Sequence, residues 1–499
     1  MRLLTDTILI FIMISLTNSL LWSQIQAPSM KELEDRYPQY RESTISGKRF
    51  EVEDLIPIFD RLSENSDIQF SVNAHSLQNR PIYLASFGHG EIPVLMWSQM
   101  HGDESTATMA LLDLFNFLSS ENMEDQAFIE AIKERLTLHF IPMLNPDGAS
   151  KFQRRNASLT DLNRDALDLS NPESRFLKSV RDSLEPVFGF NLHDQSIYYR
   201  AGRNGKQVAL AFLAPAYDFD KSINDVRRRS MQLIAHLHDS LQMLIPQRIA
   251  IYDDSFEPRA FGDNIQKWGT STILIESGGY PDDPEKQYLR QLNFITLIKS
   301  LESIMSGSYE EKSVEEYQSI PENERRMLSL IIEDLKIPVE NQNIRMDIGY
   351  TYYEIVEDST TYYPANIADV GDLSTYTGFE VFPAEDFEVI AGKWFPDTMQ
   401  NIRDLADKNW KALIREGFLG FLIASDSGIG TNFTPFLIYK NPQENDERLD
   451  LVMAPGKDPT FILQARDTND RFVVHNGKIH PIERYISLVE QELNEINDQ

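Results

Sequence analysis

The sequence of 499 residues contains no cysteine. This absence excludes disulfide bonds, cysteine-ligated zinc, iron–sulfur clusters and thiol nucleophiles. It leaves histidine, aspartate and glutamate as the side chains from which a metal site in this chain can be built.

Positive charge is also scarce. The chain has 47 lysines and arginines against 77 aspartates and glutamates, a formal charge of −30. Because such a surface repels phosphate groups, the composition argues against nucleic acid or an anionic membrane as the partner. We interpret the excess of acidic residues as a solubilising surface. Local arginine clusters remain free to bind an anion in a cleft.

Long apolar runs are rare beyond the N-terminus. Residues 1–25 have the pattern of a signal peptide, with Arg2, an apolar stretch at 8–16, and small or polar residues toward Ser23. A retained membrane anchor is the alternative, but the apolar stretch is short for a span and is interrupted after Leu16. We therefore expect export to an extracytoplasmic location. No later segment is long and apolar enough to cross a bilayer.

The length exceeds what one hydrophobic core usually supports, so two domains are expected. Strands alternate with helices over 26–305, which predicts an α/β domain with its site at the carboxyl edge of the sheet. The polar, acid-rich stretch 306–325 is predicted to be a linker. Residues 326–499 contain short β-branched and aromatic runs, typical of a smaller β-rich accessory domain that ends in an amphipathic helix. We expect that domain to be a stabilising module rather than a substrate-capturing one.

Periodicity and turn signals give the boundaries of the expected elements in the first domain. The expected strands are 68–72, 81–87, 92–97, 136–144, 187–192, 208–213 and 271–275. The expected helices are 52–62, 105–118, 172–184, 223–244 and 284–304.

The stretch Met100–Ser105 separates an expected strand from an expected helix. His101 and Glu104 are three residues apart, so on a tight turn their side chains can converge on one point. Zn²⁺ accepts an imidazole nitrogen and a carboxylate oxygen there, and needs a third protein ligand while keeping one position for water. Taken alone, the pair is a weak signal, and a surface turn explains it better.

Three further sites place polar residues at strand ends or in adjoining loops. They are the arginine-rich loop from Arg154 to Arg164, the strand-terminal His193, and Glu276 after a buried strand. His193 would complete an N₂O ligand set with His101 and Glu104. Glu276 could accept a proton from the water at the open position. A structural histidine and a strand-edge charge are the plain alternatives.

The order and spacing of these motifs resemble a known family, the zinc carboxypeptidases related to pancreatic carboxypeptidase A. The shared motifs are His-x-x-Glu at 101–104, Asn-Pro-Asp-Gly at 145–148, Asp-Leu-Asn-Arg at 161–164, His193 and Glu276. The resemblance covers roughly Arg41 to Ile304. It implies a mixed-sheet α/β fold, one Zn²⁺ per chain, and hydrolysis of the C-terminal amide bond of peptides.

The resemblance also implies roles for individual residues. His101, Glu104 and His193 would bind zinc, with Glu276 as the general base and acid. Asn163 and Arg164 would bind the terminal carboxylate of the substrate, a bidentate task suited to a guanidinium group. Arg154 would stabilise the oxyanion, with its neighbour Arg155 as the rival candidate.

The sequence departs from the family pattern at three places. Asp194 follows the third expected ligand where the pancreatic enzymes commonly have serine. The mobile active-site tyrosine has no clear match, with Tyr252 as the candidate, and segment 253–261 is unusually charged. Two alternatives to a peptide-cleaving carboxypeptidase therefore stay open. One is an amidase of the same superfamily that acts on a γ-linked or D-residue cell-wall peptide, and the other is a catalytically silent binding protein.

Overall fold

The computed structural model describes residues 27–203, 205–339, 342–357, 360–400, 404–405, 408–423, 438–440, 449 and 451–498. The chain divides into two compact units, Met1–Arg325 and Arg326–Gln499. The expected signal peptide at 1–25 lies outside the described residues. In the part of the chain that is described, no helix combines the length and apolarity needed to cross a membrane.

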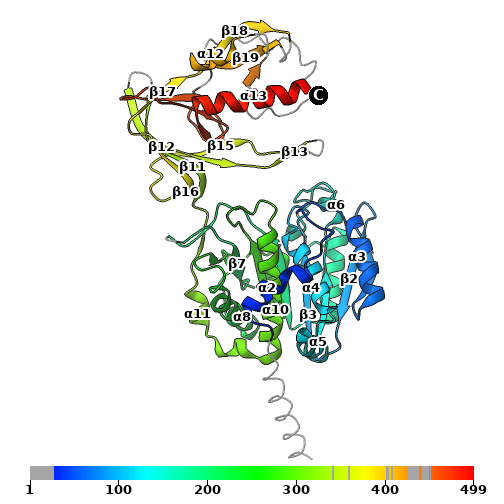
Figure 1. Ribbon diagram of the computed structural model, residues 1–499. Helices are drawn as coiled ribbons and strands as arrows, with labels where there is room; N and C mark the ends of the chain where they lie inside the picture. Colours follow the sequence, from blue (N-terminus) through cyan, green and yellow to red (C-terminus); the bar gives the residue numbers. More distant parts are fainter. Residues whose placement is uncertain are drawn as a thin grey trace, which may run out of the picture. The chain divides into compact units, whose positions relative to one another are not determined.

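An eight-stranded mixed sheet runs through the first unit in the order β1-β2-β4-β3-β5-β9-β7-β8 (Figure 1). The neighbours β4, β3, β5 and β9 pair in parallel, whereas β1–β2, β2–β4 and β7–β9 pair antiparallel. The strands are β1 Gln69–His75, β2 Pro81–Phe87, β3 Ile92–Ser98, β4 Leu136–Ile141, β5 Phe188–Asp194, β7 Leu210–Leu213, β8 Ile249–Ile251 and β9 Ser271–Ser277.

Helices pack on both faces of this sheet because its central strands are apolar on both sides. In β3, Val94 and Met96 join one buried cluster, while Leu95 and Trp97 join another. The first cluster includes residues from α2 Met30–Tyr40, α3 Val52–Asn65, α4 Thr106–Leu118, α5 Met123–Arg135, α8 Asp225–Leu241 and α10 Gln287–Ser306. The second includes residues from α7 Pro172–Leu184 and α9 Phe261–Lys267. The predicted mixed α/β architecture of this unit is confirmed.

The segment 306–325 is folded, contrary to the prediction of a linker. It forms η2 Ser308–Glu311, α11 Val314–Gln318 and β10 Asn323–Glu324. Tyr317 is buried in the first unit's core, where its phenol oxygen accepts a hydrogen bond from the Ala214 amide at 3.2 Å. β10 pairs with β6 Arg200–Ala201. Buried apolar side chains between the acidic residues, Tyr309, Tyr317 and Ile320, hold the segment on the first unit.

The second unit is β-rich, as predicted. Its larger sheet has the order β15-β12-β11-β17-β21-β22-β23, with β16 paired to β11, and a smaller sheet has the order β18-β19-β20. The larger sheet consists of β11 Met327–Val339, β12 Gln342–Tyr352, β15 Ala365–Gly371, β16 Thr377–Pro383, β17 Phe387–Ala391, β21 Phe461–Ala465, β22 Arg471–His475 and β23 Lys478–Pro481. The smaller sheet consists of β18 Lys393–Met399, β19 Phe418–Ile423 and β20 Ile438–Lys440.

The C-terminal part of this unit follows the sequence signals closely. The turn between β22 and β23 is Asn476-Gly477, and both residues have the positive φ that such a hairpin turn requires, at 47° and 61°. The closing helix α13 Ile482–Asp498, red in Figure 1, buries Ile486, Val489 and Leu493 in the unit's own core.

A buried ion pair fastens α4 to α10 in the first unit. Arg290 donates to Asp113 through Nε at 2.7 Å and Nη2 at 2.5 Å, and both side chains are fully buried. Asp113 also accepts from the Tyr37 hydroxyl at 2.7 Å, and Arg290 donates to the Ile45 carbonyl at 2.7 Å. The pair thus ties two sheet-covering helices to α2 and to the chain segment that follows it.

We predict that Asp113→Ala destabilises the protein by about 3–5 kcal/mol, because the Arg290 charge stays buried without its counter-charge. Asp35→Ala is the control, since Lys31 and Asp35 form an ion pair with side chains 69% and 58% exposed, and its loss should cost less than about 1 kcal/mol. Chemical denaturation followed by circular dichroism measures both. An equal loss of unfolding free energy in the two variants would show that the buried pair stabilises the protein no more than an exposed one.

Candidate metal centre

The turn between β3 and α4 carries two of the expected ligands and is held by close backbone packing. The Glu104 amide donates to the His101 carbonyl at 3.1 Å, and Gln99 Nε2 donates to the Gly102 carbonyl at 2.9 Å. A Cβ atom on Gly102 would lie 2.0 Å from the Gly148 carbonyl carbon, so a side chain has no room there. The turn therefore presses against the Asn-Pro-Asp-Gly segment, which explains why a glycine follows His101.

Three predicted ligands converge at this turn. His101 Nδ1 lies 2.8 Å from one Glu104 oxygen, and His193 Nδ1, at the end of β5, lies 2.6 Å from the other. The two imidazole Nδ1 atoms are 3.2 Å apart. All three side chains are buried, and their ligand atoms lie within 4.8 Å of one another. Two imidazole nitrogens and a carboxylate oxygen in this arrangement suit one Zn²⁺ ion.

The electrostatics of the three side chains also fit a cation. Burial opposes charge on His101, but the Glu104 and Asp161 carboxylates outweigh it and raise the pKa of His101 to about 9. Burial would likewise raise the pKa of Glu104, yet the two imidazoles hold it well below its usual range. Burial lowers the pKa of His193, which favours the neutral form that binds metals. The site thus stabilises positive charge at its centre.

Asp161 holds the ring of one expected ligand, His101, a contact that the sequence did not reveal. Its Oδ1 lies 3.0 Å from His101 Nε2, and its Oδ2 accepts from Arg154 Nε at 3.2 Å and Nη2 at 3.1 Å. A carboxylate on the far nitrogen of a metal-binding imidazole fixes the ring's tautomer and direction. Its position two residues before Asn163 in the Asp-Leu-Asn-Arg motif was the one available signal.

The structure distinguishes between the two adjacent arginines. Arg154 Nη1 lies 3.1 Å from Glu104 and 3.0 Å from His101 Nδ1. Arg155 donates to the Leu159 carbonyl at 2.9 Å within its own exposed loop. Arg154 is therefore the arginine that reaches the centre.

Glu276 lies beside His193, the third expected ligand. It occupies β9 at the register position of His193 on β5, and it is buried. Burial and the nearby Glu104 charge raise the pKa of Glu276 well above its usual value. Tyr252 is close enough for Glu276 to affect it, since burial and then the Glu276 charge raise the pKa of the Tyr252 phenol.

Asn163 and Arg164 lie at the rim, in η1 Leu162–Arg164. They contact segment 253–261 rather than the three ligands. Asn163 Oδ1 accepts from the Phe261 amide at 2.9 Å, and Arg164 Nε lies 3.5 Å from Glu257. Asp165 follows them and bonds the Asn171 amide at 3.0 Å, which holds the loop.

Asp194, which departs from the family pattern, has a positively charged neighbour. Asp194 Oδ2 accepts from Lys286 Nζ at 3.1 Å and from the Thr106 hydroxyl at 2.6 Å. Its amide donates to Glu104 at 3.2 Å. The extra carboxylate thus has a counter-charge in Lys286, but its negative charge still helps to raise the pKa of Glu276.

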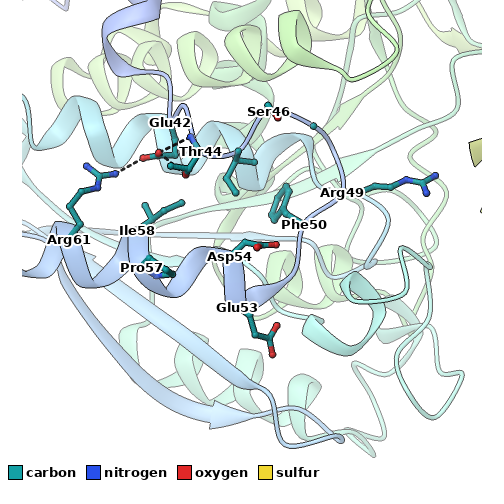
Figure 2. A pocket seen from close by; sticks show the side chains of 12 residues that line it. Glu42, Thr44, Ser46, Arg49, Phe50, Glu53, Asp54, Pro57, Ile58 and Arg61 are labelled. Atoms are coloured by element: carbon teal, nitrogen blue, oxygen red, sulfur yellow. Dashed lines mark hydrogen bonds and ion pairs between the residues drawn. The ribbon is translucent and has the colours of Figure 1, made fainter. Parts of the chain in front are cut away.

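A separate cavity of about 590 Å³ lies between α3 and residues 42–50, and it contains none of the predicted site residues (Figure 2). Ile45, Phe50 and Ile58 give it apolar walls. Across it, Arg61 is already paired with Glu42. This cavity adds no group to the metal centre.

Comparisons with known proteins find carboxypeptidases. A zinc carboxypeptidase family model matches residues 59–189. Carboxypeptidase SOL1 of Arabidopsis thaliana is 42% identical over 69 residues, which cover 14% of each chain. Carboxypeptidase 2 of Trichophyton rubrum is 29% identical over 147 residues, covering 28% of this chain and 26% of the relative. The chain thus spans about a quarter or less of the length of these relatives.

A comparison with solved structures finds, among others, a metallo-carboxypeptidase from Burkholderia cenocepacia. It is 15% identical, with a TM-score of 0.42, over 52% of this chain and 70% of the other. The family match includes His101, Glu104, Arg154, Asn163 and Arg164 and ends before His193 and Glu276. The resemblance to the zinc carboxypeptidases is confirmed over residues 59–189. Beyond that stretch, the fold brings His193 and Glu276 to neighbouring positions at the end of β5 and β9.

Proposed function

We propose that this chain is an exported zinc metallocarboxypeptidase that hydrolyses the C-terminal amide bond of peptides. The observation that carries the proposal is the convergence of His101, Glu104 and His193, with Glu276 on the neighbouring strand. A surface turn or a strand-edge charge would not bury these groups against one another. Export through a signal peptide at 1–25 is part of the proposal.

His101, Glu104 and His193 would hold one Zn²⁺, which supplies a Lewis acid that polarises a carbonyl group and activates a water molecule. Glu276 acts as the proton carrier. One of its carboxylate oxygens accepts a proton from the attacking water and then donates it to the departing amine. The raised pKa of Glu276 suits a group that takes up a proton and returns it.

Arg154, held by Asp161, brings a positive charge to the centre. With Asp161 holding its Nε and Nη2 atoms, Arg154 presents Nη1 toward Glu104 and His101. A guanidinium fixed in this way can stabilise negative charge that develops on the carbonyl oxygen. Asn163 and Arg164 would bind the free carboxylate of the substrate at the rim.

We predict that His193→Ala loses zinc and activity together while the fold survives, because two protein ligands remain where three are needed. His139→Ala is the matched control, since His139 lies in β4 of the same sheet and outside the ligand group. Zinc is measured by elemental analysis and folding by circular dichroism. Full zinc content in the His193 variant would show that the ligand assignment is wrong.

The second prediction concerns proton transfer. Glu276→Gln keeps the shape of the side chain but cannot accept a proton, so turnover should fall about 10²–10⁴-fold with zinc content unchanged. Glu173→Gln is the control, because Glu173 is a buried carboxyl with a raised pKa that bonds the Leu77 amide, away from the ligands. A Glu276 variant with kcat within about threefold of the parent would identify a different base.

The third prediction tests recognition of the carboxylate. Arg164→Lys loses planar bidentate geometry, so kcat/KM should fall for peptides with a free C-terminus far more than for C-terminally amidated peptides. Equal losses on both would mean that the enzyme does not recognise the terminal carboxylate. That result would favour the amidase that acts on a non-standard cell-wall peptide.

A further inference from the structure

Segment 253–261, the charged stretch that the family pattern leaves unexplained, is fastened to the loop that carries Asn163 and Arg164. The Phe261 amide donates to Asn163 Oδ1 at 2.9 Å. The Ala166 amide donates to the Arg259 carbonyl at 3.2 Å. The two segments therefore form one surface at the rim of the metal centre.

The hydrogen bond from the Phe261 amide fixes the orientation of the Asn163 side-chain amide. Since Oδ1 is bound to a backbone N–H, the Nδ2 group is directed away from Phe261 as a donor. Arg164 is restrained in a similar way. Its Nη1 donates to the Asn163 carbonyl at 2.7 Å, and its Nε lies 3.5 Å from Glu257 Oε2. Its Nη2 makes no hydrogen bond with any residue that the structure describes.

Glu257 is itself held in place. Arg259 donates to both of its oxygens, through Nε and Nη2 at 3.0 Å each, and the Glu257 amide donates to Asp263 at 3.0 Å. The hydrogen bonds from Arg259 lower the pKa of Glu257, so it carries its charge at neutral pH. Arg164, Glu257 and Arg259 are 37%, 31% and 58% exposed, so a ligand can reach the cluster from solvent.

The cluster lies within electrostatic reach of the reaction centre. The Asp161 charge acts on both Arg164 and Arg259, and Asp161 contacts His101 at 3.0 Å. A carboxylate bound at Arg164 would thus lie near Asp161, the residue that contacts the expected ligand His101.

We propose that Glu257 is a positioning residue for substrate binding. Clamped by Arg259, it fixes the Arg164 guanidinium while the Phe261 amide fixes Asn163, so that Nη2 and Nδ2 form a donor-only pair for the substrate's terminal carboxylate. The inference rests on the proposed function, because it takes Arg164 as the group that binds this carboxylate. Preorganising both donors before binding spares the ordering cost that a free side chain would incur.

The test is Glu257→Gln, which keeps the size of the side chain and removes its charge. KM for a free-acid peptide should rise about fivefold, the effect of losing one partly exposed ion pair, with kcat unchanged. KM for the C-terminally amidated peptide should not change. Glu257→Asp, which keeps the charge, should recover part of the loss. A fall in KM would show that Glu257 competes with the substrate for Arg164, and the proposal would then be wrong.

Asp253→Asn is the matched control. Asp253 lies in the same segment and bonds the Ser255 amide and hydroxyl, away from Arg164, so the free-acid KM of this variant should equal that of the parent. An equal rise in both variants would trace the effect to the loss of a negative charge in general, and would overturn the positioning role.

A binding measurement separates this inference from the peptidase proposal. Calorimetric titration with N-acetylphenylalanine and with its amide needs no hydrolysis. Weaker binding of the acid alone in Glu257→Gln would support the positioning role even if no peptide is cleaved. If peptides are cleaved and Glu257→Gln matches the parent in both KM and acid binding, the positioning role is excluded while the peptidase proposal stands.

Discussion

The contact of the Glu104 carboxylate with His101, His193 and Arg154 is the interaction on which the first unit's organisation depends. A buried carboxylate costs several kcal/mol unless it is paired and hydrogen-bonded. Its partners come from the turn after β3, from the end of β5 and from the loop at 152–165. All three segments must therefore be in place before the charge can be buried. The close approach of Gly102 to Gly148 holds the turn between His101 and Glu104 against the Asn-Pro-Asp-Gly segment.

Much of the fold could be predicted because its signals are local. Met109, Leu112, Phe115 and Leu118 follow a helical period, and all four are buried in α4. The strands that carry His193 and Glu276 contain short apolar runs before these residues, and every position of β9 is buried. Residues at the ends of adjacent parallel strands share one edge of the sheet, so their meeting follows from topology alone.

Other features depend on contacts that a linear pattern does not contain. The expected linker at 306–325 is rich in acidic residues, a composition typical of an exposed segment. It packs on the first unit nevertheless, because Tyr309, Tyr317 and Ile320 are buried in that unit's core. Arg154 and Arg155 are adjacent and identical in type, so the choice between them rests on the course of one loop. Asp161 acts on an imidazole sixty residues away in sequence.

The short pairing of β10 with β6 bears on how the two units can be studied apart. Asn323 Nδ2 donates to Gln195 at 2.6 Å, Glu324 accepts from Arg200 Nη2 at 2.9 Å, and the Pro321 carbonyl accepts from the Ile251 amide at 2.8 Å. Gln195 is two residues from His193, and Ile251 directly precedes Tyr252. A shortened protein that stops at the end of α10 would lose these contacts to the segments that carry His193 and Tyr252. The N-terminal unit, expressed alone, therefore has to extend through Glu324.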